Sequence, residues 1–526
     1  MKPSKRTLFS YLTELAEERP SRPLLGDSNG WLSASFAHLL VSSMARKLSA
    51  AGLRSGDYVC VRASRTTETA LLLFALARLG VVSALIDPRE EPEAALAQSE
   101  HAIPATKYLE ADSHMGSPVI YLADAATGNL TSVVLNRVAA GHSERSKKDT
   151  KEQNKPAQDS ASAANQASDI SLPAEGPSTA PAFIIFTSGS TGKRKAVVLS
   201  QYNLVNNLVD SEPLGCYTKD DLALGALPMD HVFGLVLLAG TAVLGYGEYL
   251  CEAKGVDELM NIIDREKLTR MNGVPSLYLA MAARKDAHDL STMRAGFIAG
   301  SPSTADEFNL IESALGMTLV SVYGMSECIG ISCSSYQDPA PVRAGGVGPF
   351  YPMNTGKILK LGADGQATDQ EAAIGEEGEI VVDGPARMVG YYGDEEPRAA
   401  FLHTGDLGYL DENKVLHITG RIKEIIIRNG NNLSPRAIEE ALLMVPGVSA
   451  AAVVGLPHKI EGEVPAAMVV ATPEAYRNLT NPFYSLPGGL KKNQIPALYR
   501  NVDALPLTAS GKPDKQEIKK LLMKEL

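Results

Sequence analysis

Apolar residues along the chain gather in short runs whose spacing predicts alternating helices and strands. Residues 68–79 (ETALLLFALARL) have the spacing of a helix, Gly80 ends it, and the following VVSALID predicts a buried strand that ends at Asp87. The stretches 220–250 and 260–300 alternate in the same way. This alternation predicts an α/β fold of layered subdomains with mainly parallel sheets.

Two later regions have a different pattern. Residues 376–420 contain short alternating runs separated by turn residues, which predict small antiparallel sheets and hence a small β-rich subdomain. From residue 423 onward, the pattern predicts a compact α+β domain with a helix at 434–444, strands at 450–455 and 466–471, and a final Lys-rich helix. We therefore place a boundary near Lys423, between a large domain at 1–422 and a C-terminal domain at 423–526.

Residues 141–181 interrupt the α/β pattern. The segment has no aromatic residue and is dense in Ser, Ala, Lys, Gln, Asp and Pro. Such a composition buries too little apolar surface to offset the entropy of ordering the chain. We expect a flexible surface insertion without a function of its own.

The overall composition is that of an ordinary globular protein. The 526 residues are 44% apolar and 21% charged, which suits about three to four structural units with buried cores. The net charge of −11 disfavours nucleic acid as the main partner, but it leaves room for a local basic site that binds a small anion.

Cysteine usage and hydropathy bear on the compartment. The five cysteines form no C-x-x-C pair, which argues against a disulfide framework or a zinc ribbon and favours a reducing, cytoplasmic setting. The basic N-terminus lacks the apolar stretch of a signal peptide. The most apolar run, 70–86, is interrupted by Arg78 and Gly80, so we expect a buried helix and strand rather than a membrane span.

The most informative stretch for chemistry is FIIFTSGSTGKRKAVVLS at 183–200. An apolar strand leads into a loop whose glycines allow tight turns, and whose hydroxyl and lysine side chains suit a polyphosphate. The loop is not a Walker A loop, because Thr187 and Arg194 stand where that motif requires Gly and Ser or Thr. The following AVVL predicts a strand rather than a helix. Taken alone, the loop is equally compatible with a polar turn between strands.

Four other positions are weaker candidates when each is considered alone. Tyr323-Gly-Met-Ser-Glu327 follows the apolar strand LVSV, and it offers a ring to stack on a base, a hydroxyl, and a hard oxygen ligand for Mg²⁺. The turn at 404–406 ends in Asp406, a carboxylate of the kind that binds ribose hydroxyls. Lys512 follows a glycine at an expected loop tip, and His231 adjoins an apolar run. A solvated Glu, a solvated Lys and a core His are the simpler interpretations.

Taken in order, the motifs make the chain resemble the adenylate-forming superfamily, which includes acyl- and aryl-CoA synthetases, peptide-synthetase adenylation domains and luciferases. The resemblance rests on TSGSTGKRK, AGSPS at 299–303, YGMSE, HTGD, GRIKEIIIRNGNNLSP and LTASGKPDK. It extends from Leu71 to the C-terminus. It implies a large N-terminal AMP-binding domain followed by a mobile C-terminal domain with its hinge at Lys423.

The resemblance also implies a reaction. ATP and Mg²⁺ would activate a carboxylic acid to an acyl-adenylate with release of pyrophosphate, and a thiol would then accept the acyl group. The residues implied to bind ATP are Thr187, Ser188, Gly189, Ser190, Thr191, Gly192, Lys193, Lys195, Gly300, Ser301, Tyr323, Asp406 and Arg421. The implied catalytic residues are Lys512, Glu327 as the Mg²⁺ ligand, Ser326 and His231 beside the acid, with the thiol approaching near Gly430.

Departures from the family pattern narrow the substrate. Activators of α-amino acids usually carry an Asp directly after the position of His231, whereas this chain has Val232, and Asp230 should point elsewhere. An aryl acid or a short or medium acyl acid therefore fits better. Arg194 and Ala196 replace the usual Pro and Gly at the end of the phosphate loop, which puts the local backbone geometry in question.

Three interpretations of the function remain, and the first two differ in the thiol that accepts the acyl group. Coenzyme A is the favoured thiol acceptor. The phosphopantetheine of a separate acyl carrier protein is an alternative, acting in trans because no carrier domain follows Leu526. A reading of another class is a nucleotide-binding protein that keeps the fold but turns over weakly, and the altered segment 194–196 is its only support.

Overall fold

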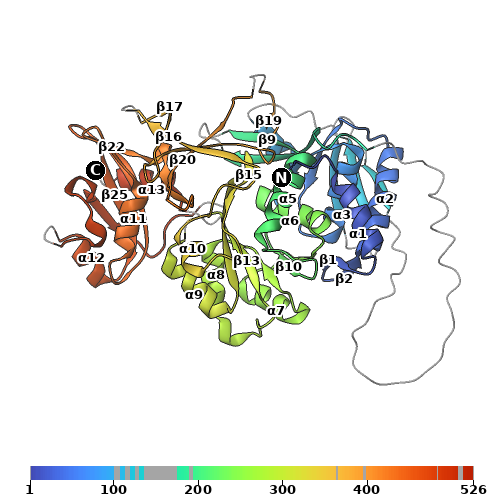
Figure 1. The fold of residues 1–526 in the computed structure, drawn as a ribbon, viewed down its shortest axis with the longest axis horizontal. Coiled ribbons are helices and arrows are strands. Elements are labelled where there is room, and N and C mark those ends of the chain that lie inside the picture. Colours follow the sequence, from blue (N-terminus) through green and yellow to red (C-terminus); the bar gives the residue numbers. More distant parts are fainter. Residues whose placement is uncertain are drawn as a thin grey trace. The chain divides into compact units, whose positions relative to one another are not determined.

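The structure is a computed structural model that describes residues 2–99, 107–112, 119–124, 130–134, 175–188, 193–301, 303–362, 365–394, 398–481, 484–507 and 513–524 (Figure 1). The chain divides into two compact units. The first comprises Met1–Ala344, Tyr351–Asn354 and Gly384–Ala399, and the second comprises Gly345–Phe350, Thr355–Asp383 and Ala400–Leu526.

The first sheet of the first unit has the strand order β15-β14-β13-β12-β10-β11-β1-β2. Its strands are β1 (Pro23–Asp27), β2 (Gly30–Ser33), β10 (Leu222–Gly225), β11 (Gly247–Leu250), β12 (Arg270–Met271), β13 (Ala295–Ile298), β14 (Thr318–Met325) and β15 (Cys328–Cys333). The two edge strands, β2 and β15, pair antiparallel and all inner pairs are parallel. The carboxyl ends of β10, β12, β13 and β14 therefore share one edge, where ligands bind in sheets of this kind.

The second sheet has the order β19-β9-β8-β4-β3-β5-β6-β7. Its strands are β3 (Tyr58–Arg62), β4 (Val82–Ile86), β5 (Lys107–Asp112), β6 (Val119–Asp124), β7 (Leu130–Val134), β8 (Pro181–Ser188), β9 (Arg194–Ser200) and β19 (Gly390–Tyr391). β8 runs parallel to β4, and β9 returns antiparallel to β8. The prediction that a strand, not a helix, follows the hydroxyl-rich loop is confirmed.

Helices cover these sheets. They are α1 (Leu8–Glu18), α2 (Ala34–Ala50), α3 (Thr67–Leu79), α4 (Pro92–Ala97), α5 (Gln201–Ser211), α6 (Val232–Val243), α7 (Val256–Glu266), α8 (Pro275–Ala282), α9 (Ala305–Leu315) and α10 (Ala340–Gly345). The predicted helix before Gly80 is α3, which is capped by Thr66 and ends where Gly80 adopts a left-handed φ of 71°. β4 follows and is buried along its whole length, as its apolar sequence predicted.

The described residues of the second unit form two sheets and three α-helices. The antiparallel third sheet has the order β17-β16-β18-β20-β21, and the fourth has the order β23-β22-β25-β24 with β26 added beside β25. The strands are β16 (Thr355–Leu361), β17 (Ala367–Glu371), β18 (Gly378–Asp383), β20 (Leu402–Leu410), β21 (Leu416–Arg421), β22 (Ile426–Arg428), β23 (Asn431–Leu433), β24 (Val448–His458), β25 (Gly462–Ala471) and β26 (Leu498–Asn501). The helices are α11 (Pro435–Leu443), α12 (Pro473–Leu479) and α13 (Lys515–Met523). The small antiparallel sheet and the α+β pattern after residue 423 are confirmed, while α12 and β26 were not predicted.

The remaining predictions have mixed outcomes. The boundary at Lys423 lies inside the second unit, and the division into 1–422 and 423–526 stays a prediction. Most of the expected insertion, 141–174, lies outside the described residues. All five cysteines are buried, and none of them forms a disulfide with another. Among the helices that the structure describes, none combines the length and apolarity needed to cross a membrane.

Candidate active site

The β8–β9 hairpin carries the residues predicted to bind phosphate. Thr187 pairs with Lys195 across the hairpin, and Ser188 pairs with Arg194. Because successive strand residues face opposite sides, Arg194 and Lys195 project from opposite faces of the hairpin. Lys193 is exposed directly before β9. The loop residues between the strands, Gly189, Ser190, Thr191 and Gly192, lie outside the described residues.

The two substituted residues of this hairpin have structural partners. Arg194 donates two hydrogen bonds to the carboxylate of Glu90, at 2.8 and 2.5 Å, and this pairing raises the pKa of Arg194. Ala196 pairs with Phe186 and is buried in the apolar cluster of the second sheet. The side chain at position 196 is therefore accommodated within a regular strand, and Arg194 ties the hairpin to the segment after β4.

Glu327 lies in the turn between β14 and β15, at the carboxyl edge of the first sheet. It is 9% exposed, and its Oε1 accepts a hydrogen bond of 2.8 Å from the Tyr391 hydroxyl. The ring of Tyr391 lies 4.5 Å from the ammonium of Lys195, a cation–π contact. β19 pairs with β9 and so brings Tyr391 beside the β8–β9 hairpin. Three residues that are distant in sequence thus converge at one place.

This arrangement fits Mg²⁺. The described residues contain no group of three or more His, Cys, Asp or Glu placed to hold a metal ion. Mg²⁺ is usually bound through one or two carboxylates together with substrate phosphates and water, so a single carboxylate beside the hairpin predicted to bind phosphate is an appropriate donor set. Among the described residues, no Lys or Arg forms an ion pair with Glu327. Its carboxylate oxygens are ligands that suit this hard cation.

The predicted adenine and α-phosphate residues lie on the same sheet edge. Gly300 and Ser301 follow β13, and Gly300 has a φ of 85°, a conformation that favours glycine. A side chain at position 300 would also come within 3.2 Å of Val274. Tyr323 is buried on β14, and Ser326 is buried in the turn beside Glu327. The parallel register of β13 and β14 places these two segments next to each other.

His231 caps the first turn of α6. Its Nδ1 accepts a hydrogen bond of 3.2 Å from the backbone N–H of Phe233, and the residue is exposed, so the interpretation as a core histidine is wrong. Burial raises the pKa of the adjacent Asp230, which interacts electrostatically with Asp87, Arg65 and Glu90. Asp230 thus belongs to the charged cluster around the β4 end.

Asp406 and Arg421 are brought together in the second unit. Their strands β20 and β21 pair them directly, and Arg421 Nε lies 2.9 Å from Asp406 Oδ1. The carboxylate is buried while the guanidinium side chain is 61% exposed. The prediction that residues 404–406 form a turn is wrong, because they lie inside β20. Gly405 has a φ of 71°, so the strand is irregular at this point. In the sequence, a glycine in an irregular strand resembles a glycine in a turn.

The hinge and lysine candidates are only partly described. Lys423 is exposed in a short 3₁₀ helix at Ile422–Glu424, and Lys512 lies outside the described residues. Nearby, Lys515 at the start of α13 pairs with Glu424 at 2.6 Å and Glu439 at 3.0 Å. These ion pairs fix the start of α13 to the segment that follows Lys423.

Sequence reasoning missed Tyr391 and Glu379. Glu379 holds the 403–405 segment by accepting from the Gly405 N–H at 3.0 Å and by contacting His403 at 2.8 Å. Neither residue belongs to a motif with an independent chemical signal. Their roles depend on strand pairings between distant segments, which a single sequence does not display.

The fold and these convergent residues define a member of the adenylate-forming superfamily. The chain belongs to the AMP-binding enzyme family, which matches residues 12–392, and the AMP-binding enzyme C-terminal domain matches residues 437–512.

Known proteins extend this likeness over nearly the whole chain. Sulfoacetate–CoA ligase of Cupriavidus necator is 30% identical over 96% of this chain and 96% of its own length. Naringenin synthase of Pestalotiopsis fici is 30% identical over 98% of this chain, which spans 19% of that protein. Two other curated relatives match 64% and 55% of this chain, which spans 62% and 51% of their own lengths. The ATP-bound crystal structure of MatB from Rhodopseudomonas palustris has the same fold, with a TM-score of 0.78, 23% identity, and coverage of 98% and 99% of the two chains.

Proposed function

We propose that this protein is an AMP-forming acid–thiol ligase that activates a carboxylic acid with ATP and transfers the acyl group to coenzyme A. The observation that carries the proposal is the convergence of Lys195, Tyr391 and Glu327 at the ligand-binding edge of the first sheet. The names of relatives that ligate acids to CoA support the same reaction class.

The first half-reaction joins two anions. The carboxylate attacks the α-phosphorus in line, and pyrophosphate leaves toward the β8–β9 hairpin, where Lys193 and Lys195 oppose its charge. Ser326 contacts the α-phosphate, while Gly300, Ser301 and Tyr323 hold the adenine. Mg²⁺ held by Glu327 would neutralise part of the triphosphate charge. The product is a mixed anhydride, the acyl-adenylate.

The second unit supplies the remaining groups in this proposal. Asp406 and Arg421 bind the ribose hydroxyls, and Lys512 bridges the substrate carboxylate and the α-phosphate. Rotation about Lys423 then withdraws Lys512 and admits the thiol near Gly430. The acid lacks an α-ammonium, because Val232 follows His231 where an aspartate would be required to pair it.

The test is acid-dependent exchange of pyrophosphate into ATP over a broad panel of aryl and acyl acids. Lys512→Ala should abolish most of the exchange, whereas Lys520→Ala, an exposed lysine on α13 paired with Glu517, should retain it. Mass spectrometry of products formed with CoA or with a phosphopantetheinylated carrier protein identifies the acceptor. Failure of every acid to support exchange would favour a nucleotide-binding protein without turnover.

A further inference from the structure

Arg270, the first residue of β12, is a fully buried cation with unused hydrogen-bond donors. Its exposed fraction is 0%, and its Nη2 donates to the Cys216 Sγ at 2.8 Å. Its Nε and Nη1 have no hydrogen-bond partner among the described residues. Buried polar groups are nearly always paired, and an unpaired one lowers the free energy of unfolding by about 1–3 kcal/mol. We therefore expect these donors to bind an acceptor.

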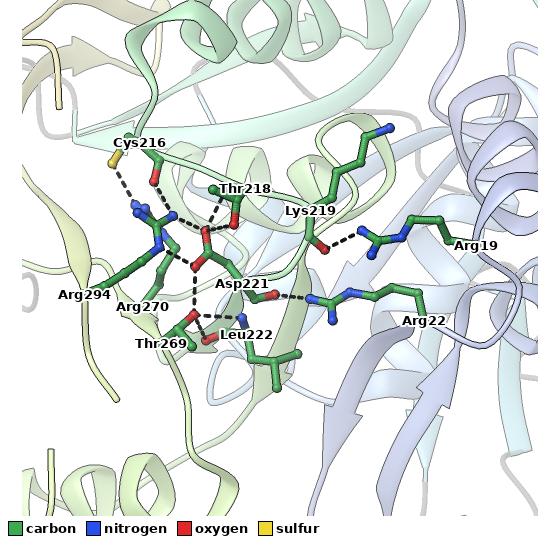
Figure 2. A network of polar contacts seen from close by, with 10 residues as sticks. All are labelled: Arg19, Arg22, Cys216, Thr218, Lys219, Asp221, Leu222, Thr269, Arg270 and Arg294. Carbon is green, nitrogen blue, oxygen red and sulfur yellow. Dashed lines mark hydrogen bonds and ion pairs between the residues drawn. The ribbon is translucent and has the colours of Figure 1, made fainter. Parts of the chain in front are cut away.

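Among the described residues, no carboxylate forms an ion pair with Arg270, and the buried Glu248 lies two strands away on the same face of the sheet. Asp221, the nearby carboxylate, is engaged by two hydrogen bonds from Arg294 (Figure 2). Burial raises the pKa of the Cys216 thiol and of the Tyr217 hydroxyl, so both stay neutral. Tyr217 contributes the face of its ring, 3.8 Å from the guanidinium carbon. Two guanidinium groups therefore share one carboxylate.

The position of Arg270 relates it to the candidate active site of the first unit. Arg270 pairs with Ala223 and Ala295, so all three side chains lie on one face of the sheet. Strand alternation places Phe297 on that face too, and its ring lies 5.7 Å from the guanidinium carbon. Both register partners of Arg270 are alanines, whose short side chains do not reach its guanidinium group.

The same face leads to the adenine segment. Phe297 packs in one apolar cluster with Leu237 of α6, the helix that begins at His231, and with Phe233 and Tyr217. Three residues beyond Phe297, the chain reaches Gly300. At ~3.3 Å per strand residue, the Phe297 ring beside the guanidinium therefore lies about 10 Å before Gly300, whereas the backbone of Arg270, in register with Ala295, lies about 17 Å before it.

We propose that Arg270 determines substrate specificity by binding a second oxygen group, a carboxylate or a phenol oxygen, at the far end of the acid. This inference rests on the proposed function and names its substrate class: aryl or medium-chain acids that carry an acceptor oxygen about 10 Å from the activated carboxyl group. The planar guanidinium presents parallel donors that suit such oxygens.

The experiment compares matched acids by exchange of pyrophosphate into ATP. Butanedioic, hexanedioic, octanedioic and decanedioic acids are each compared with the monocarboxylic acid of equal carbon number, and 4-hydroxycinnamic acid is compared with cinnamic acid. We expect kcat/KM for the acid with the second oxygen group to exceed that of its partner by about 10- to 100-fold. This preference should appear among the diacids near octanedioic acid, in the comparison of 4-hydroxycinnamic with cinnamic acid, or in both. The two arms distinguish a distal carboxylate from a phenol.

Substitution of Arg270 tests the assignment. Arg270→Met should reduce the preference to near unity or reverse it, because the donors are lost while the volume is largely kept. Glu248→Gln is the control: Glu248 is buried on β11, which β10 separates from β12, burial raises its pKa to about 8, and the neutral isostere should keep the wild-type preference. Thermal melting reports whether each variant folds.

Several outcomes would overturn the inference. A wild-type enzyme that prefers the methyl- or hydrogen-terminated acid in every pair would do so, and this result does not depend on any variant. If a folded Arg270→Met protein lost kcat/KM equally for both acids of a pair, Arg270 would have a purely structural role, with its donors satisfied by buried water. Absence of exchange with all acids would instead overturn the proposed function itself.

Discussion

Two buried carboxylates at opposite edges of the first sheet differ in how fully they are paired. Asp221 lies at the amino edge, directly before β10, and its oxygens accept hydrogen bonds from Thr218, Thr269 and Arg294 (Figure 2). Glu327 lies at the carboxyl edge and accepts one hydrogen bond from a neutral donor, Tyr391. The saturated carboxylate holds the fold together, and the other retains capacity for a ligand.

The position of each carboxylate in the sheet explains why Asp221 is more fully paired than Glu327. Thr269 directly precedes β12 and Arg294 directly precedes β13, so Asp221 joins the starts of three parallel strands. Arg22 donates to the Asp221 carbonyl at 2.6 Å, which adds the N-terminal segment to the same network. At the carboxyl edge, the loops after the strands diverge and leave backbone and side-chain groups available.

The largest expected effect is loss of stability at the amino edge. Asp221→Ala leaves Arg294 and Thr269 without their acceptor, and we expect a loss of about 3–5 kcal/mol in the free energy of unfolding. Urea or thermal unfolding measures it. Asp264→Ala, which breaks the exposed ion pair with Lys267, is the control and should change stability little. Equal losses in the two variants would contradict the structural role of Asp221.

At the carboxyl edge, substitution of Glu327 should lower activity rather than stability. Glu327→Gln keeps the shape and the acceptor for Tyr391 but removes the charge, and it should lower kcat/KM for ATP–pyrophosphate exchange by about 100- to 1000-fold. Its melting temperature should stay close to that of the wild type. If Glu327→Gln destabilised the protein as much as Asp221→Ala, the distinction between the two edges would be lost.

A smaller effect is expected from the residue that orients Glu327. Tyr391→Phe removes the hydroxyl that donates to the carboxylate but keeps the ring beneath Lys195, and it should lower exchange by about 10-fold. Tyr392→Phe, one residue further along, is the control, because Tyr392 packs against Tyr58 in the core of the second sheet. A Tyr391→Phe enzyme with unchanged kcat and KM would show that the hydrogen bond has no part in catalysis.

The last expected effect is a pH dependence of stability from Glu248. Its folded-state pKa of about 8 lies above the ordinary value of 4.5, so the folded protein keeps a proton that the unfolded chain loses. The wild type therefore loses stability as the pH rises from about 4.5 to about 8, and about 1 kcal/mol of this loss falls between pH 7 and pH 8. Glu248→Gln should remove this slope and equal the wild type near pH 4. Melting curves of both proteins from pH 4 to pH 8.5 measure it, and parallel curves would contradict the assignment.

The fold was largely predictable because its elements are strongly patterned. α3 and β4 are nearly continuous apolar runs separated by Gly80, and β18, β20 and β21 alternate as an antiparallel sheet requires. α12 and β26 escaped prediction because each is short and gains its place only by packing on β25. The 404–406 segment was misread because a glycine within an irregular strand resembles a turn.

By itself, the sequence determined the family, the order of the motifs, and which residue types can oppose phosphate charge or hold a hard metal ion, because these follow from local composition and spacing. Only the tertiary structure decided that Tyr391 reaches Glu327, that Arg194 is engaged by Glu90, and that two donors of Arg270 have no partner among the described residues. The reason is physical: whether a polar group is satisfied depends on every neighbour that folding brings to it, and those neighbours come from strands far apart in the chain.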